Sequence, residues 1–120
     1  MKEETLRDIG EFECIHRIAH DLIYRPELVK LGTGDDGAVF MTPCGYDEVI
    51  SMDTMVEGIH FTKRTMSAAD TGYHLCAVNF SDMAAMGAEP VSFVISAALP
   101  GDLSITWIES CYDGIRECCR

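Results

Sequence analysis

The segment from Ser67 to Pro90 constrains the fold of this 120-residue chain most, because it predicts one long and nearly all-apolar helix. Ser67 and Asp70 have the spacing of a capping box at its start, with Asp in place of the usual Glu or Gln. Gly87 and then Pro90 are typical of a helix end. Apolar residues recur at helical spacing along one side: Tyr73, Ala77, Phe80 and Ala84. A helix of this composition is usually buried on most sides, so it predicts a globular core.

Two further segments have helical periodicity. Residues 9–23 carry an apolar stripe that Pro26 ends, and a second stripe begins near Ser104. The stripes consist of Phe12, Ile15, Ile18, Ala19 and Leu22 in the first segment and of Ile105, Ile108, Tyr112 and Ile115 in the second. The second pattern still runs at Arg120, without a glycine cap or a proline stop. We therefore expect residues 1–120 to be one domain of a longer chain.

Three short runs are rich in β-forming residues. We expect residues 38–41 and 49–56 to pair as a hairpin with an irregular loop, and residues 91–99 to form a buried strand. The order helix, strand, strand, helix, strand, helix predicts an α+β domain. Its small sheet would be mixed or antiparallel, with helices packed on one face.

Composition argues against several function classes. The formal net charge of −11 argues against nucleic-acid binding, because an acidic surface repels phosphate backbones. No apolar run approaches the roughly 20 residues of a membrane helix, and the charged start of the chain does not resemble a secretory signal. The six cysteines have no paired metal spacing, so we expect reduced thiols in a cytoplasmic protein.

An acidic, glycine-rich motif, Gly34-Asp35-Asp36-Gly37, follows the first helical segment. Adjacent carboxylates repel each other, so a folded site usually compensates them with a cation. The flanking glycines let the backbone approach a ligand closely. Taken alone, the motif fits an ordinary surface turn better than a metal site.

A second acid, Asp53, lies in the strand-like run of residues 50–56, where propensity disfavours it. Alternation places Ser51 and Asp53 on one face of that run. Both side chains offer the oxygen ligands that suit Mg²⁺. The alternative is a solvent-facing acid on an edge strand.

A third acid, Asp82, follows Asn79 by three residues on one face of the apolar helix. A carboxylate in such a helix must be paired, hydrogen-bonded or metal-bound, and a structural pair is an equal alternative. Three separate segments thus place an acid where local propensity argues against one. Such conflicts are expected at functional sites.

His60 lies just after residues 50–56, the strand-like run that contains Asp53. It could hydrogen-bond a substrate or a phosphate, although a lone loop histidine is more often a surface residue. The sequence has no Walker phosphate loop and no Gly-x-Gly-x-x-Gly motif after a strand. Any nucleotide would therefore be held mainly through bridging metal ions, which suits phosphoryl transfer.

In order and spacing, these motifs resemble those of the thiamine-monophosphate kinase family, a branch of the aminoimidazole ribonucleotide synthetase superfamily. The resemblance covers about residues 10–120 and is carried by residues 34–38, 51–61 and 73–90. Its most specific piece is Asp53-Thr54-Met55-Val56-Glu57-Gly58-Ile59-His60-Phe61.

The resemblance implies a synthetase-like N-terminal domain and phosphorylation of thiamine monophosphate to the diphosphate, with ATP as phosphate donor and Mg²⁺ as cofactor. It also implies Mg²⁺ ligands at Asp36, Ser51, Asp53 and Asp82, and a substrate contact at His60. A second domain would complete the active site, and a homodimer would form through the sheets.

Met52 departs from the family pattern, which usually has Ser or Thr at this position. The ligand is kept if the family uses the backbone oxygen there, and it is lost if the family uses the hydroxyl. Asp35 and Asn79 are possible supporting residues. Two alternatives stay open: a related synthetase or hydrogenase-maturation domain, and a metal-binding or dimerisation module without catalysis.

Overall fold

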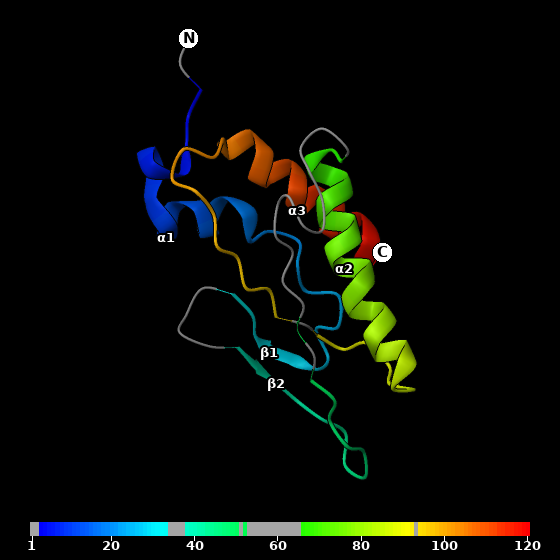
Figure 1. The fold of residues 1–120 in the computed structure, drawn as a ribbon. Helices are drawn as coiled ribbons and strands as arrows, with labels where there is room; N and C mark the ends of the chain where they lie inside the picture. The colour runs from blue at the N-terminus through cyan, green and yellow to red at the C-terminus, as the bar shows by residue number, and fades with distance from the viewer. Residues whose placement is uncertain (1–2, 34–37, 51, 53–65, 93) are drawn as a thin grey trace.

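A computed structural model describes residues 3–33, 38–50, 52, 66–92 and 94–120. Its elements are, in chain order, α1 (Leu6–Ile18), β1 (Val29–Leu31), β2 (Val39–Phe40), α2 (Ala68–Ala85) and α3 (Ile105–Cys119). The α+β class and the small antiparallel sheet agree with the sequence prediction. Figure 1 shows the helices grouped on one side of the molecule and the β1–β2 sheet on the other.

Helices α2 and α3 form the core, and two glycines allow their backbones to meet. A Cβ atom at Gly72 would overlap the carbonyl oxygen of Cys111, and one at Gly114 would overlap that of Ala69. Only glycine therefore permits this approach at either position. The buried side chains of the pair are Thr71, Cys76, Asn79 and Met83 on α2 and Ile105, Ile108, Cys111, Ile115 and Arg116 on α3.

The ends of α2 confirm the sequence prediction. At its start, the Ser67 hydroxyl accepts a hydrogen bond from the Asp70 backbone N–H at 3.1 Å. At its end, Gly87 has a φ of +67°, and the N–H of Ala88 donates to the Met83 carbonyl at 2.8 Å. This arrangement is a Schellman motif, which satisfies carbonyl groups that the last helical turn leaves free.

The buried face of α2 differs from the predicted stripe. Tyr73 and Ala84 are exposed, whereas Cys76, Asn79 and Met83 are buried. The reason is that Gly72 determines which side of the helix reaches α3, and glycine carries no hydropathy signal. The predicted stripe of α3 fits better, because three of its four members, Ile105, Ile108 and Ile115, are buried.

Helix α1 is shorter than the predicted helix over residues 9–23 and begins earlier. The N–H of Thr5 donates to the carboxylate of Asp8 at 2.9 Å, which fixes its first turn. Gly10 interrupts the helical backbone with a φ of +79°. The predicted apolar stripe does not form a buried face, since Phe12 is 85% exposed.

Arg116 of α3 explains why α1 ends well before Pro26. This arginine is buried, and its Nε–H donates to the carbonyl of His20 at 2.8 Å. A second guanidinium N–H donates to the carbonyl of Ile18, the last residue of α1. The side chain of α3 thereby satisfies carbonyl groups that a longer helix would have bonded internally.

The sheet differs from the predicted one in its pairing. Strand β2 pairs antiparallel with β1, with Val29 opposite Phe40 and Leu31 opposite Val39 across an irregularity. The predicted hairpin with residues 49–56 is therefore wrong for the described residues 49, 50 and 52, which form no strand. The preceding segment supplies the partner instead.

The predicted strand over residues 91–99 is also absent wherever this segment is described. Val94 is 59% exposed. A strand requires a neighbour for its backbone hydrogen bonds, and these residues have none in the described part of the chain. Apolar composition alone does not provide that neighbour.

Candidate functional site

The predicted site residues fall into two groups. The structure describes Met52, Asn79 and Asp82. Outside the described residues lie Asp35, Asp36, Ser51, Asp53 and His60. The described geometry therefore concerns mainly the part of the site that α2 carries.

Asn79 is the most unusual polar residue of α2, with only 1% of its surface exposed. Its amide nitrogen donates to the Leu75 carbonyl at 2.9 Å. Its Oδ1 atom is buried and has no hydrogen-bond partner among the described residues. Buried polar atoms nearly always have a partner, so this oxygen marks a place where a donor or a cation would be favourable.

Asp82 follows Asn79 by three residues and is half-buried. Residues at this spacing are neighbours on a helix surface, which adds a carboxylate oxygen to the amide oxygen. Both are the hard ligands that Mg²⁺ prefers, so these two residues fit the ion chemically. The described residues alone contain no cluster of three potential His, Cys, Asp or Glu ligands. A complete ligand set would therefore need acids from the other predicted segments.

Met52 fits the ion less well through its side chain, which is 52% exposed. A thioether is a soft ligand, whereas Mg²⁺ takes oxygen. Only the backbone carbonyl oxygen of Met52 would suit the predicted role.

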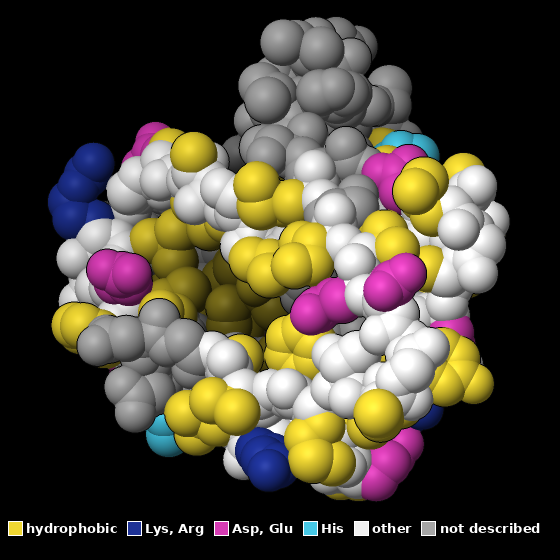
Figure 2. All heavy atoms as spheres, turned by 90° about the horizontal axis from the view of Figure 1, so that it is seen from below, with side chains coloured by type: hydrophobic (Ala, Val, Ile, Leu, Met, Phe, Trp, Pro, Cys, Tyr) yellow, Lys and Arg dark blue, Asp and Glu magenta, His cyan; other side chains and the backbone are white. Residues whose placement is uncertain are grey.

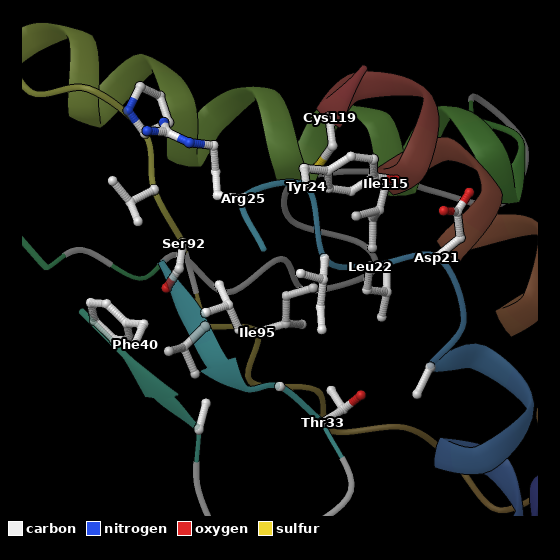
Figure 3. A pocket seen from close by; sticks show the side chains of 18 of the residues that line it. Asp21, Leu22, Tyr24, Arg25, Thr33, Phe40, Ser92, Ile95, Ile115 and Cys119 are labelled. Atoms are coloured by element: carbon white, nitrogen blue, oxygen red, sulfur yellow. The ribbon is translucent and has the colours of Figure 1, made fainter. Parts of the chain in front are cut away.

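A cavity of about 890 Å³ separates the helices from the sheet. In the close-up view, Leu22, Phe40, Ile95 and Ile115 surround it, and they come from four different parts of the chain (Figure 3). A space-filling view from below shows a hollow with hydrophobic walls on this face (Figure 2). Such a space suits the apolar part of a ligand, with polar groups at its edge.

Sequence neighbours of two predicted acidic segments line the cavity. Thr33 and Ala38, which flank the acidic motif 34–37 in sequence, both line it. Phe80, which lies between Asn79 and Asp82 on α2, lines it as well. Two of the three predicted acidic segments are therefore adjacent in sequence to residues of one cavity.

Arg25 is a cavity residue that sequence analysis missed. Its guanidinium contacts Glu27 at 2.7 Å and Glu89 at 3.0 Å, so it links the segment after α1 to the segment after α2. Hydrogen bonds to Glu27 and Glu89 raise the pKa of Arg25, and the same contact with Arg25 lowers the pKa of Glu27. No periodicity or motif marks Arg25, because both pairs depend on the folded path of the chain.

Comparison with known proteins relates this geometry to a family. The family model described as AIR synthase related protein, N-terminal domain, matches residues 34–120. The chain belongs to this family. The match begins at Gly34, so the AIR synthase related domain contains every predicted site residue, whereas α1 and β1 precede it.

Three curated relatives of this AIR synthase related chain share one name. It is 41% identical over 87 residues to a "Thiamine-monophosphate kinase" of Synechococcus elongatus, covering 72% of this chain and 27% of the relative. It is 38% identical over 109 residues to that of Bacillus subtilis, covering 91% and 33%. It is 41% identical over 109 residues to that of Escherichia coli strain K12, covering 90% and 33%. The chain thus spans about a third of the length of these relatives.

Two further comparisons bear on the class of protein. None of the solved structures gives a significant match. Within the described ranges, no helix combines the length and the hydropathy that crossing a membrane requires.

Proposed function

We propose that this chain supplies the metal- and phosphate-binding part of an ATP-dependent thiamine-monophosphate kinase. The observation that carries the proposal is the similarity to relatives of that name, at 38% and 41% identity over about nine tenths of the chain. The buried amide oxygen of Asn79 beside Asp82 supports a cation site within the matched domain.

The proposed reaction is a direct in-line transfer. A phosphate oxygen of thiamine monophosphate attacks the γ-phosphorus of ATP, and the bond from that phosphorus to the bridging oxygen breaks, which yields thiamine diphosphate and ADP. The proposed Mg²⁺ ligands are Asp36, Ser51, the backbone oxygen of Met52, Asp53 and Asp82, with Asp35 and Asn79 in support. A bound Mg²⁺ would neutralise charge on the phosphate oxygens.

The chain's own residues contribute positioning. Helix α2 is held against α3 by the contact at Gly72, so Asn79 and Asp82 project from a firmly packed element. Catalytic groups on such elements are placed more accurately than groups on loops. His60 is the proposed contact to the substrate.

A homodimer through the sheet and a cytoplasmic location belong to the same proposal. In the part of the chain that the structure describes, β1 and β2 form a two-stranded sheet, and Leu31 and Val39 are 41% and 50% exposed. Open strand edges with apolar side chains favour pairing with another chain.

A chimeric enzyme tests the proposed function. The chain replaces the matching 109-residue region of the Bacillus subtilis relative, and thiamine diphosphate formation from thiamine monophosphate and ATP is followed by chromatography. We expect Mg²⁺-dependent turnover. Asp82→Asn should reduce it by about 100-fold or more, because it weakens a proposed metal ligand while keeping the side-chain shape.

The matched control is Asp70→Asn, which removes the same charge from an exposed position of α2. It should leave turnover nearly unchanged, and urea unfolding should show that both variants fold. Full activity of the Asp82→Asn chimera would contradict the site assignment. A folded chimera that consumes ATP without phosphorylating thiamine monophosphate would favour the related-synthetase alternative.

A further inference from the structure

Cys76 and Cys119 form a close pair of thiols at the contact of α2 with the last turn of α3. Their sulfur atoms lie 3.6 Å apart, and both cysteines are free. Cys76 is fully buried in the middle of α2, whereas Cys119 is partly exposed as the last residue of α3. The pair therefore joins two elements that are 43 residues apart in sequence.

We propose that Cys76 and Cys119 are a redox-modification site, which a peroxide oxidises to a disulfide between α2 and the end of α3. This inference does not depend on the proposed function. It assigns a reversible covalent link to a pair of side chains that the predicted metal and substrate site does not use.

The geometry requires only a small movement. A disulfide bond is about 2.05 Å long, so the two sulfur atoms must approach by about 1.6 Å. Cys119 is partly exposed, so its side chain has room to rotate toward Cys76. Close packing at Gly72 and Gly114 keeps the two helices in place while this happens.

Access to the pair is asymmetric. Cys119 lines the cavity, and Figure 3 shows it beside Tyr24 at the cavity edge. Cys76 has no exposed surface. The hydrogen bond between the thiols lowers the pKa of Cys119 and raises the pKa of Cys76. An oxidant in the cavity would therefore contact Cys119 before Cys76. Cys119 is also the thiol that ionises more readily, so it is the better nucleophile.

The chemistry balances with hydrogen peroxide as the oxidant. The Cys119 thiolate attacks one peroxide oxygen, the O–O bond breaks, and a sulfenic acid forms with release of hydroxide. The hydroxide takes up the proton that the Cys119 thiol lost and leaves as water. The Cys76 sulfur then attacks the Cys119 sulfur, loses its proton and displaces the hydroxyl group as a second water. Two thiols are oxidised to one disulfide, and one peroxide is reduced to two waters.

Metal binding by the same thiols is the less favoured reading. Cys118 also lies close enough to Cys76 to affect its pKa, so three cysteines gather here. Even so, the described residues contain no group of three side chains arranged to hold a metal ion. A pair at 3.6 Å suits a disulfide better.

Peptide mapping tests the proposal on the full chain. The reduced protein is treated with hydrogen peroxide, its remaining thiols are alkylated, and it is digested with trypsin. Cleavage after Arg64 and Arg116 places Cys76 in peptide 65–116 and Cys119 in peptide 117–120. We expect these two peptides to be linked with the loss of two hydrogens, and dithiothreitol to separate them.

Serine variants at the three cysteines determine which thiol reacts. Cys118→Ser should keep the link at an unchanged rate, and Cys119→Ser should slow its formation at least tenfold. Trapping with dimedone should label Cys119 in the Cys76→Ser variant, which reports the sulfenic acid even if the helix packing loosens. The proposal is overturned if peroxide leaves peptides 65–116 and 117–120 unlinked, or if Cys118→Ser abolishes the link.

Discussion

The α2–α3 helix pair and the β1–β2 sheet show opposite relations between sequence and packing. In the helix pair, two glycines bring backbones into contact, and Ile108 and Ile115 are almost fully buried. In the sheet, apolar residues of similar size remain open to solvent, with Leu31 41% and Val39 50% exposed. The two regions differ in whether the described chain supplies a second surface that covers their apolar side chains.

Helices α2 and α3 bury their apolar faces against each other, whereas the sheet residues Leu31 and Val39 stay partly exposed. Helix α3 carries its own capping residue, since the Ser104 hydroxyl accepts a hydrogen bond from the Trp107 N–H at 3.2 Å. Among the described residues, strand β2 pairs only with β1. We therefore expect the stability of the chain to reside mainly in the helix pair.

Filling the glycine contact should have the largest effect. Gly72→Val would force a side chain against the Cys111 carbonyl, and we expect it to lower the free energy of unfolding by about 3 kcal/mol or more. Urea denaturation measures this change. Val39→Thr in the sheet should change stability by less than about 1 kcal/mol, since its side chain is half-exposed. Equal losses of unfolding free energy in the two variants would contradict the claim that the helix pair contributes more stability than the sheet.

The next largest effect should come from Arg116. Arg116→Ala removes a buried guanidinium from the carbonyls of Ile18 and His20, and we expect a loss of about 2 to 3 kcal/mol in unfolding free energy. Arg120→Ala is the matched control, because its contact with Asp21 is exposed and 3.5 Å long. Surface pairs of this kind contribute at most about 1 kcal/mol. A smaller loss for Arg116→Ala than for Arg120→Ala would show that α1 is not held by α3.

Alkaline pH should weaken the helix pair to a smaller extent. Burial raises the pKa of Cys111 from 9.0 to about 11. Between these values the unfolded chain loses this proton and the folded chain keeps it, so stability falls as pH rises from about 9 to about 11. The loss attributable to Cys111 is on the order of 2 kcal/mol. Equilibrium unfolding at pH 8 and pH 11 should show a shallower decline in Cys111→Ala, and an identical decline would exclude Cys111 as a cause.

The helices were easier to predict than the strands for a physical reason. The limits of α2 are encoded locally by Ser67 and Gly87, which act on the backbone within a few residues of themselves. The end of α1 is not local, because it depends on Arg116 almost a hundred residues away. Strand β1 was missed, and the strand over residues 91–99 was wrongly predicted, since pairing is decided by distant partners.

The candidate site also has features that are encoded locally and features that depend on distant residues. Asp82 was predicted on an apolar helix next to Asn79, and the structure confirms that helix and adds the buried, unpartnered Oδ1 of Asn79 among the described residues. Burial of that atom could not be predicted, because it depends on the face that Gly72 presents to α3. The metal-binding roles remain predictions for all the proposed ligands: Asp36, Ser51, Met52, Asp53 and Asp82.

Paramagnetic NMR with Mn²⁺ in place of Mg²⁺ tests most directly whether α2 carries one side of a metal site. Mn²⁺ shares the oxygen ligands of Mg²⁺ and broadens amide signals near its binding site. We predict that substoichiometric Mn²⁺ broadens the amides around Asn79 and Asp82 first, and that Asp82→Asn abolishes this effect. Broadening confined to the exposed acids near the N-terminus, such as Glu3 and Glu4, would contradict the account.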